Sequence, residues 1–201
     1  MILSPRHELL IAGAVAALAA LAFIGTLAHA LLLPTTDTET VASSTAAALP
    51  RAAPVRIRIP ALAIDAPVED VGIAPSGRMA VPRSYTGTGW YRGGPAPGEN
   101  GSAVIDGHVD NGLGLPGVFK NLKALVPGDL IDIDAADGTR RTFRVVETAA
   151  YPYDQVPSEK LFLRDDAPRL NLITCSGKWD QEGKTYDERL VVYAVLTDGV
   201  S

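Results

Sequence analysis

From Val55 onward, short runs of alternating or β-branched apolar residues recur along the chain, and turn-forming residues separate them. Such runs are typical of β-strands that bury one face. We predict strands at 55–59, 102–107, 129–134, 141–148, 170–175 and 189–196, with weaker candidates at 63–71 and 79–82. The two runs around Asp137-Gly138 predict a β-hairpin. The whole pattern predicts an all-β fold, a closed or nearly closed barrel of roughly seven or eight strands, with at most a short helix near 118–122 or 158–163.

The amino-terminal segment 9–33 has a different pattern, because its residues are almost all apolar and leave no polar face. A helix of these 25 residues extends about 37 Å, and the hydrocarbon core of a bilayer is about 30 Å thick. Arg6-His7 precedes the segment, so the positive-inside rule places residues 1–8 in the cytoplasm. A cleaved signal peptide is the alternative, because Ala28-His29-Ala30 imitates a cleavage site, although the apolar region of signal peptides is typically only about 7–15 residues long.

Residues 34–54 are rich in Thr, Ser, Ala and Pro and show neither helical nor strand periodicity. This composition is typical of a linker. We therefore predict four parts: a cytoplasmic end at 1–8, a transmembrane anchor at 9–33, an extracellular linker at 34–54 and one folded domain at 55–201. The predicted location is the cell membrane, crossed once, with the folded domain outside the cell.

The chain is slightly acidic, with 18 basic and 23 acidic residues and a formal net charge of −5. Its basic residues do not cluster into the concentrated positive face that binding to nucleic acid requires. We therefore predict no nucleic-acid partner.

The single cysteine, Cys175, ends the predicted strand at 170–175, just before Ser176-Gly177. One thiol cannot form an internal disulfide, so Cys175 is either part of the core, as free cysteines often are, or a reactive group. A single cysteine together with a distant histidine is the pattern of a thiol nucleophile.

His108 is the only histidine of the predicted folded domain, because His7 and His29 lie in or beside the apolar segment. It follows the predicted strand at 102–107, so an imidazole and a thiol both stand at strand ends and can meet on one rim of a barrel. A free thiol is mostly protonated at neutral pH, and a nearby imidazole can accept its proton. Arg189 begins the last predicted strand, where its guanidinium is either a solvated charge or a group that stabilises an oxyanion.

These residues and their surroundings resemble the sortase family. The resemblance is carried by Gly107-His108-Val109-Asp110 after an apolar run, by the sequence LNLITC at 170–175 and by RLVVYA at 189–194. It covers about residues 55–197 and is closest to the class E and F sortases of high-GC Gram-positive bacteria. Asn171 stands where the family pattern begins with Thr.

The resemblance implies an eight-stranded β-barrel in which His108, Cys175 and Arg189 converge at one end of a groove. It implies a membrane-anchored cysteine transpeptidase that cleaves an LPXTG-like sorting signal between Thr and Gly. In that reaction Cys175 is the nucleophile that forms a thioester, His108 donates and accepts the proton, and Arg189 stabilises the oxyanion or the substrate. The implied partners are surface proteins that carry the signal and an amine of the cell wall, such as a peptidoglycan precursor.

We predict no cofactor and no metal, since one cysteine and one usable histidine do not make a zinc site. The carboxylates Asp65, Glu69 and Asp70 are candidates for a calcium site, but such a run is usually a solvated face. Two alternatives to a sortase stay open. One is a catalytically inactive, membrane-tethered binding module, and the other is a different Cys/His cell-wall transpeptidase, such as an L,D-transpeptidase, in which the two residues lie close together in sequence.

Overall fold

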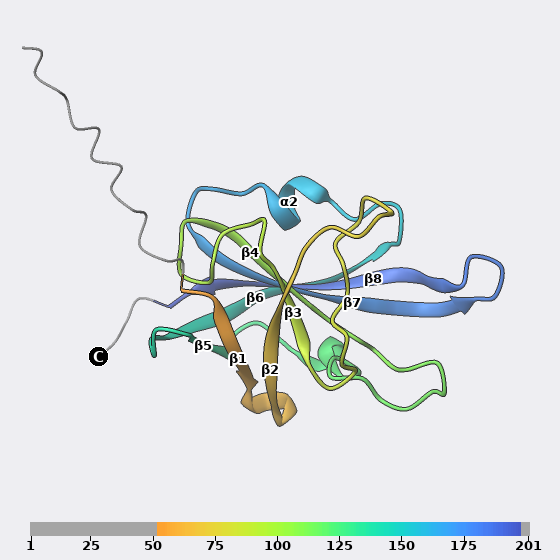
Figure 1. The fold of residues 1–201 in the computed structure, drawn as a ribbon, viewed down its shortest axis with the longest axis horizontal. Coiled ribbons are helices and arrows are strands. Elements are labelled where there is room, and N and C mark those ends of the chain that lie inside the picture. The colour runs from red at the N-terminus through yellow and green to blue at the C-terminus, as the bar shows by residue number, and fades with distance from the viewer. Residues whose placement is uncertain (1–51, 198–201) are drawn as a thin grey trace, which may run out of the picture. The chain divides into compact units, whose positions relative to one another are not determined.

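The computed structural model describes residues 52–197, in which eight strands form a closed barrel (Figure 1). Around the barrel the strands follow the order β1-β2-β3-β4-β7-β8-β6-β5. Their bounds are Pro54–Ile59 (β1), Ile64–Val71 (β2), Thr88–Tyr91 (β3), Gly101–Gly107 (β4), Leu130–Ala135 (β5), Arg140–Pro152 (β6), Pro168–Asp180 (β7) and Thr185–Leu196 (β8). Short helices lie at Pro60–Leu62 (η1), Leu122–Ala124 (η2) and Ser158–Phe162 (α2). The predicted all-β barrel is therefore confirmed.

Two neighbouring pairs in the barrel are parallel, and these pairs decide which distant segments meet. β2 pairs with β3 in parallel and β4 pairs with β7 in parallel, whereas the other pairs are antiparallel. A parallel pair needs a long crossover connection, and between β4 and β7 this connection contains β5, β6 and α2. It brings the end of β4 beside β7, although the two are far apart in the sequence.

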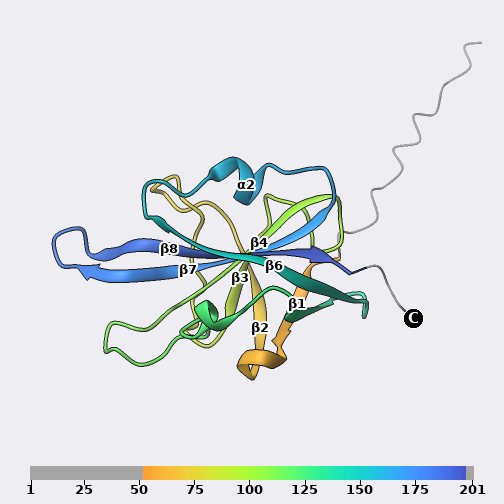
Figure 2. The ribbon, with the colours of Figure 1, turned by 180° about the vertical axis from the view of Figure 1, so that it is seen from behind.

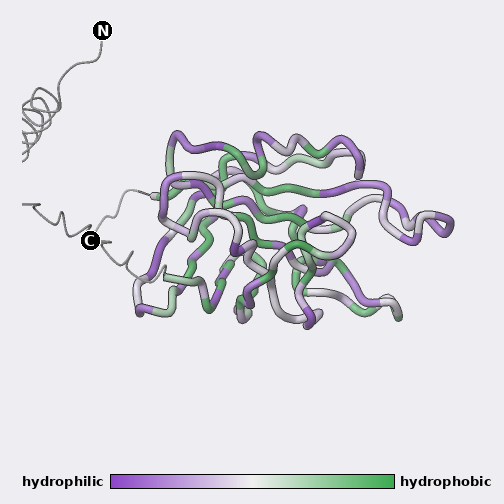
Figure 3. The backbone as a smooth tube through the Cα atoms, turned by 45° about the horizontal axis from the view of Figure 1, so that its top comes forward, coloured by the Kyte–Doolittle hydropathy of each residue, from purple (hydrophilic) through white to green (hydrophobic). Residues whose placement is uncertain are grey.

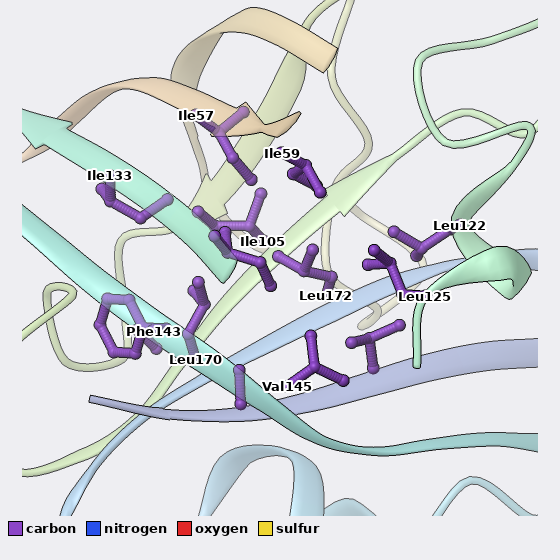
Figure 4. Close-up of a cluster of buried hydrophobic side chains, with 14 of the residues drawn as sticks. Ile57, Ile59, Ile105, Leu122, Leu125, Ile133, Phe143, Val145, Leu170 and Leu172 are labelled. Atoms are coloured by element: carbon purple, nitrogen blue, oxygen red, sulfur yellow. The ribbon is translucent and has the colours of Figure 1, made fainter. Parts of the chain in front are cut away.

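The core fills the inside of the barrel, because alternate residues of each strand point inward. Figure 4 shows side chains from β1, β4, β5, β6 and β7 converging there, with Leu122 and Leu125 closing one end. On the three strands that matter below, the inward residues are Ala103 and Ile105 (β4), Leu170 and Leu172 (β7), and Val192 and Ala194 (β8). The residues between them consequently belong to the outer face.

A second apolar cluster lies on that outer face, under α2. Leu161 of α2 packs with Val104, Val191 and Tyr193 of the barrel strands. Asn171 is buried in the same layer and donates a hydrogen bond from Nδ2 to the carbonyl oxygen of Leu161 at 2.7 Å. The helix is therefore held on the barrel by apolar contact and by one buried hydrogen bond. Figures 1 and 2 show α2 above the barrel strands.

The β7–β8 hairpin is longer than predicted and extends beyond the barrel as a two-stranded ribbon (Figures 1 and 2). Cys175 therefore does not end its strand, and Arg189 does not begin its strand, which corrects both predictions. The apolar alternation stops at Cys175 because the ribbon is mostly polar, as its purple and white colours in Figure 3 show. Within the ribbon, the rings of Trp179 on β7 and Tyr186 on β8 pack edge to face, with 5.4 Å between their centroids.

Three smaller predictions differ from the structure. Residues 79–82 are not a strand, although Met79 forms an isolated bridge with Ile73. The short helix near 118–122 is a turn followed by η2, whereas the helix near 158–163 is present as α2. The strand β3 was not predicted, because its sequence TGWY is short and contains a glycine.

The predicted cytoplasmic end at 1–8, the anchor at 9–33 and most of the linker at 34–54 lie outside the described residues. They therefore stay predictions, as do the domain boundaries. Within residues 52–197, the structure contains no helix long and apolar enough to cross a membrane.

Candidate active site

The three candidate residues lie side by side on the outer face of the barrel. Cys175 of β7 and Arg189 of β8 are direct cross-strand partners. In the parallel pair of β4 and β7, Asp106 is opposite Ile173, so continuing the register by two residues sets His108 beside Cys175. The hydroxyl of Thr174 donates to the carbonyl oxygen of Gly107 at 2.7 Å and fastens the strands at this point. The predicted meeting of thiol, imidazole and guanidinium thus agrees with the register.

The thiol of Cys175 is half-buried, and opposing effects act on its proton. Burial raises the pKa of Cys175, and the positive charge of Arg189 lowers it. The carboxylates of Asp106 and Asp110 add smaller contributions that raise the pKa again. Burial is the largest of these effects, so the free protein favours the neutral thiol, and a base must take the proton when the sulfur reacts.

The imidazole of His108 is held from the connection between β2 and β3. Its Nε2 lies 2.8 Å from the carbonyl oxygen of Pro82, and the ring of Tyr85 packs against it with 4.5 Å between ring centroids. A carbonyl oxygen only accepts hydrogen bonds, so Nε2 carries a hydrogen. In the neutral ring Nδ1 is then the free acceptor, as a base for the thiol requires.

The guanidinium of Arg189 is fixed by its own ribbon. Nη1 donates to the carbonyl oxygens of Tyr186 at 3.0 Å and Glu188 at 2.8 Å, and Nη2 donates to the hydroxyl of Thr185 at 3.1 Å. The carbon at its centre lies 5.0 Å from the centroid of the Tyr153 ring. Of the five N–H groups of a guanidinium, three are used in this way. The remaining two can therefore serve a substrate oxygen from a rigid position.

A groove with a volume of about 670 Å³ runs from these residues toward α2. This volume is in the range of ligand sites in proteins. His108, Cys175 and Arg189 lie along it, and most of its other lining is apolar. The apolar lining comes from the β2–β3 connection, β3, α2 and β7: Ile73, Met79, Val81, Tyr91, Leu161, Phe162 and Ile173. This lining suits a ligand with apolar groups.

Two further residues at this end of the barrel were not assigned a role from the sequence. Tyr186, on the ribbon, donates a short hydrogen bond from its hydroxyl to Oδ2 of Asp110. Asp110 follows His108 by two residues. The bond therefore joins the loop after β4 that carries His108, the histidine loop, to β8, the strand that carries Arg189. The only sequence signal for this hydrogen bond is that Asp110 lies close to His108 in the sequence. Tyr186 gives no signal, because it lies in a segment without periodicity.

Two of the three carboxylates considered for calcium are engaged in other contacts. Asp65 accepts a hydrogen bond from Arg56 Nε at 2.5 Å, and Glu69 binds the backbone N–H and the guanidinium of Arg83. Within residues 52–197, no three His, Cys, Asp or Glu side chains gather closely enough to hold a metal ion.

A closed barrel with a half-buried thiol, an oriented imidazole and a fixed guanidinium along a groove provides what acyl transfer by a thiol nucleophile requires. A family model described as "Sortase domain" matches residues 57–197. The chain therefore belongs to the sortase family, and membership implies a cysteine transpeptidase.

Solved structures support the same fold. Sortase C-1 from Actinomyces oris is 21% identical, with a TM-score of 0.57, and the match covers 72% of this chain and 73% of that one. Sortase C1 of Streptococcus agalactiae in complex with MTSET is 23% identical, with a TM-score of 0.56 and coverage of 73% and 68%. A lid mutant of sortase A from Corynebacterium diphtheriae is 22% identical, with a TM-score of 0.56 and coverage of 72% and 69%. A comparison with curated proteins returned no match.

Proposed function

We propose that this sortase cleaves an LPXTG-like sorting signal between Thr and Gly and transfers the protein that carries the signal to an amine of the cell wall. The observation that carries the proposal is the row of three side chains across β8, β7 and β4. In that row Arg189 and Cys175 are cross-strand partners, and the register continues to His108. The apolar groove beside the row supplies a place for the signal.

The first half of the reaction forms a thioester. The sulfur of Cys175 attacks the carbonyl carbon of the signal's Thr while Nδ1 of His108 accepts the thiol proton. The negative charge that develops on the carbonyl oxygen is stabilised by the N–H groups of Arg189 that its own ribbon leaves free. The bond between Thr and Gly then breaks, and His108 returns the proton to the departing glycine amine.

The second half resolves the thioester. An amine of the cell wall, such as that of a peptidoglycan precursor, attacks the same carbonyl carbon and loses a proton to His108. The carbon–sulfur bond breaks, the sulfur recovers a proton and a new amide bond joins the two partners. Because the free enzyme favours the neutral thiol, the proton moves to His108 only as the substrate is attacked.

The cellular setting extends the proposal. The apolar segment 9–33 anchors the chain in the membrane with the barrel outside, where surface proteins with an LPXTG-like signal are its partners. The motifs around His108 and Arg189 suggest a member of class E or F, from a high-GC Gram-positive bacterium.

The test incubates the full-length chain, purified in mild detergent, with fluorogenic LPXTG-type peptides and an amine acceptor. Wild type should cleave at least one signal, whereas Cys175→Ala and His108→Ala should lose at least about 10³-fold in kcat/KM. Mass spectrometry of wild type without acceptor should detect the acyl group on Cys175. If wild type and Cys175→Ala are equally inactive across the signals, the proposed cleavage of LPXTG-like signals is wrong. If both cleave equally, another residue does the chemistry.

A further inference from the structure

Asp106 lies in the groove directly behind the row of candidate catalytic residues. Across the outer face, Gly89 of β3, Asp106 of β4, Ile173 of β7 and Val191 of β8 are consecutive cross-strand partners. Asp106 and Ile173 line the same groove as Cys175. The mechanism above assigns no role to this carboxyl group.

The surroundings of Asp106 are unusual for an acidic side chain. Within residues 52–197, only Ser102 Oγ and Asp106 Oδ1 are enclosed side-chain atoms without a hydrogen-bond partner. A Cβ atom on Gly89 would lie 2.8 Å from Oδ1 and 2.8 Å from Val71 Cγ1, so the glycine makes room for the carboxyl. Pro82 completes this apolar pocket. An enclosed polar atom without a partner is costly, and Asp106 also lines the groove in which a peptide would lie.

Burial of Asp106 favours the protonated, neutral form of its carboxyl group. Burial raises the pKa of Asp106 to about 8, its own backbone N–H lowers the pKa, and the negative charge of Glu69 adds to the rise. A protonated carboxyl both donates and accepts a hydrogen bond. Its natural partner is therefore an uncharged polar group, because a cation would first have to expel the proton.

The distance from Asp106 to His108 along the strand indicates which side chain of a bound peptide Asp106 can contact. Residues i and i+2 of a strand are about 6.6 Å apart, so Asp106 lies one such step behind His108. An extended peptide covers this distance with about two residues. A peptide that runs along β4 with its attacked carbonyl at Cys175 can thus place a side chain within about two residues of that carbonyl over Asp106.

We propose that Asp106 is a specificity-determining residue of the groove, whose carboxyl group hydrogen-bonds to an uncharged polar side chain of the peptide within about two residues of the attacked carbonyl. This inference rests on the proposed function, since it needs a peptide in the groove. An apolar side chain at that position would leave the carboxyl unpaired, which costs a factor of about 10 or more in kcat/KM.

The experiment compares peptides that differ at one position, scanned over two residues on each side of the attacked carbonyl. Near-isosteric pairs, Asn against Leu and Thr against Val, test the hydrogen bond, and Lys tests charge. The enzymes are full-length wild type, Asp106→Ala and the matched control Asp106→Asn, each checked by thermal unfolding. At one position wild type should prefer Asn to Leu by about tenfold or more, Asp106→Asn should keep that preference, and Asp106→Ala should reduce the ratio to about one.

Three results would overturn the inference, and they differ from one another. If wild type cleaves peptides but its Asn-to-Leu ratio equals that of Asp106→Ala at every position, Asp106 does not read the peptide. If wild type prefers Lys to Asn there, the partner of Asp106 is a cation. If wild type cleaves no peptide at all, the proposed function fails and this inference fails with it.

Discussion

The inner and outer faces of β4, β7 and β8 are built from the same three strands and have opposite chemistry. The inner face consists of apolar side chains in the barrel core. The outer face carries Asp106, Cys175 and Arg189, with His108 just after β4. Neighbours in the sequence, such as Leu172 and Ile173, thus belong to different environments. The comparison shows how a small barrel separates stability from chemistry by period-two alternation alone.

The two faces also differ in how they tolerate change. An inner residue contributes volume and apolar area, so another apolar side chain of similar size can replace it at low cost. The polar residues of the outer face depend on particular surroundings, such as the carbonyl oxygens that hold Arg189. We therefore expect substitutions of the inner face to change stability and those of the polar residues of the outer face to change activity.

The largest expected effect comes from a pair of adjacent substitutions on β7. Leu172 has no exposed surface, and Leu172→Ala should lower the free energy of unfolding by about 2–5 kcal/mol, because it leaves a cavity. Ile173 is only partly buried and lines the groove, so Ile173→Ala should cost about 1 kcal/mol and raise KM severalfold. Urea unfolding and peptide cleavage by the folded fraction measure both effects. Equal losses of stability in the two variants would contradict the proposed difference between the inner and outer faces of β7.

Arg189→Lys should have the next largest effect, a loss of about 10²-fold in kcat/KM with little change in thermal stability. A single ammonium cannot hold two carbonyl oxygens and a hydroxyl and still offer N–H groups to a substrate. The matched control is Arg144→Lys on β6, an exposed arginine outside the groove, which should keep full activity. Retained activity in Arg189→Lys would show that its guanidinium is only a surface charge.

These faces also explain how much could be predicted from the sequence. Seven of the eight strands, with the weaker candidate at 63–71 present as β2, and the nearness of His108 to Cys175 could be anticipated, because apolar alternation reports directly which residues a sheet buries. The ribbon beyond Cys175 could not, since both its faces are polar and no periodicity marks it. The roles of Asp106 and Asn171 were hidden for another reason. Their burial depends on Gly89 and on α2, which lie far away in the sequence.

Asp106→Asn should change how stability depends on pH. In the unfolded chain an Asp carboxyl titrates near pH 4, and burial raises the pKa of Asp106 to about 8 in the folded protein. Between these values the folded protein holds a proton that the unfolded chain releases, so the stability of wild type falls as pH rises from about 4 to 8. Asn has no such proton. Asp106→Asn should therefore match wild type near pH 4 and become more stable than wild type by about 1 kcal/mol for each pH unit toward pH 8.

Urea unfolding at several pH values measures this difference, and Asp137→Asn is the control with the opposite sign. Hydrogen bonds from Thr139 lower the pKa of the exposed Asp137 carboxyl. The contribution of Asp137 to the stability of the folded protein is therefore present above pH 4 and is lost as the pH falls through its lowered pKa. A difference between wild type and Asp106→Asn that stays constant from pH 4 to 8 would contradict burial of a neutral carboxyl on the outer face.

The smallest expected effect tests whether the outer face is a set of separate residues or one connected network. The Tyr186 hydroxyl binds Asp110, whose carboxylate raises the pKa of Tyr186 to about 12, and the Tyr186 carbonyl accepts from Arg189. Tyr186→Phe removes only the hydroxyl, so kcat should fall about three- to tenfold with KM and thermal stability nearly unchanged. Asp110→Ala should do the same, and the double variant should lose no more than either single one, because both break the same bond. Additive losses would mean that the two residues act independently and that the histidine loop is placed by Pro82 and Tyr85 alone.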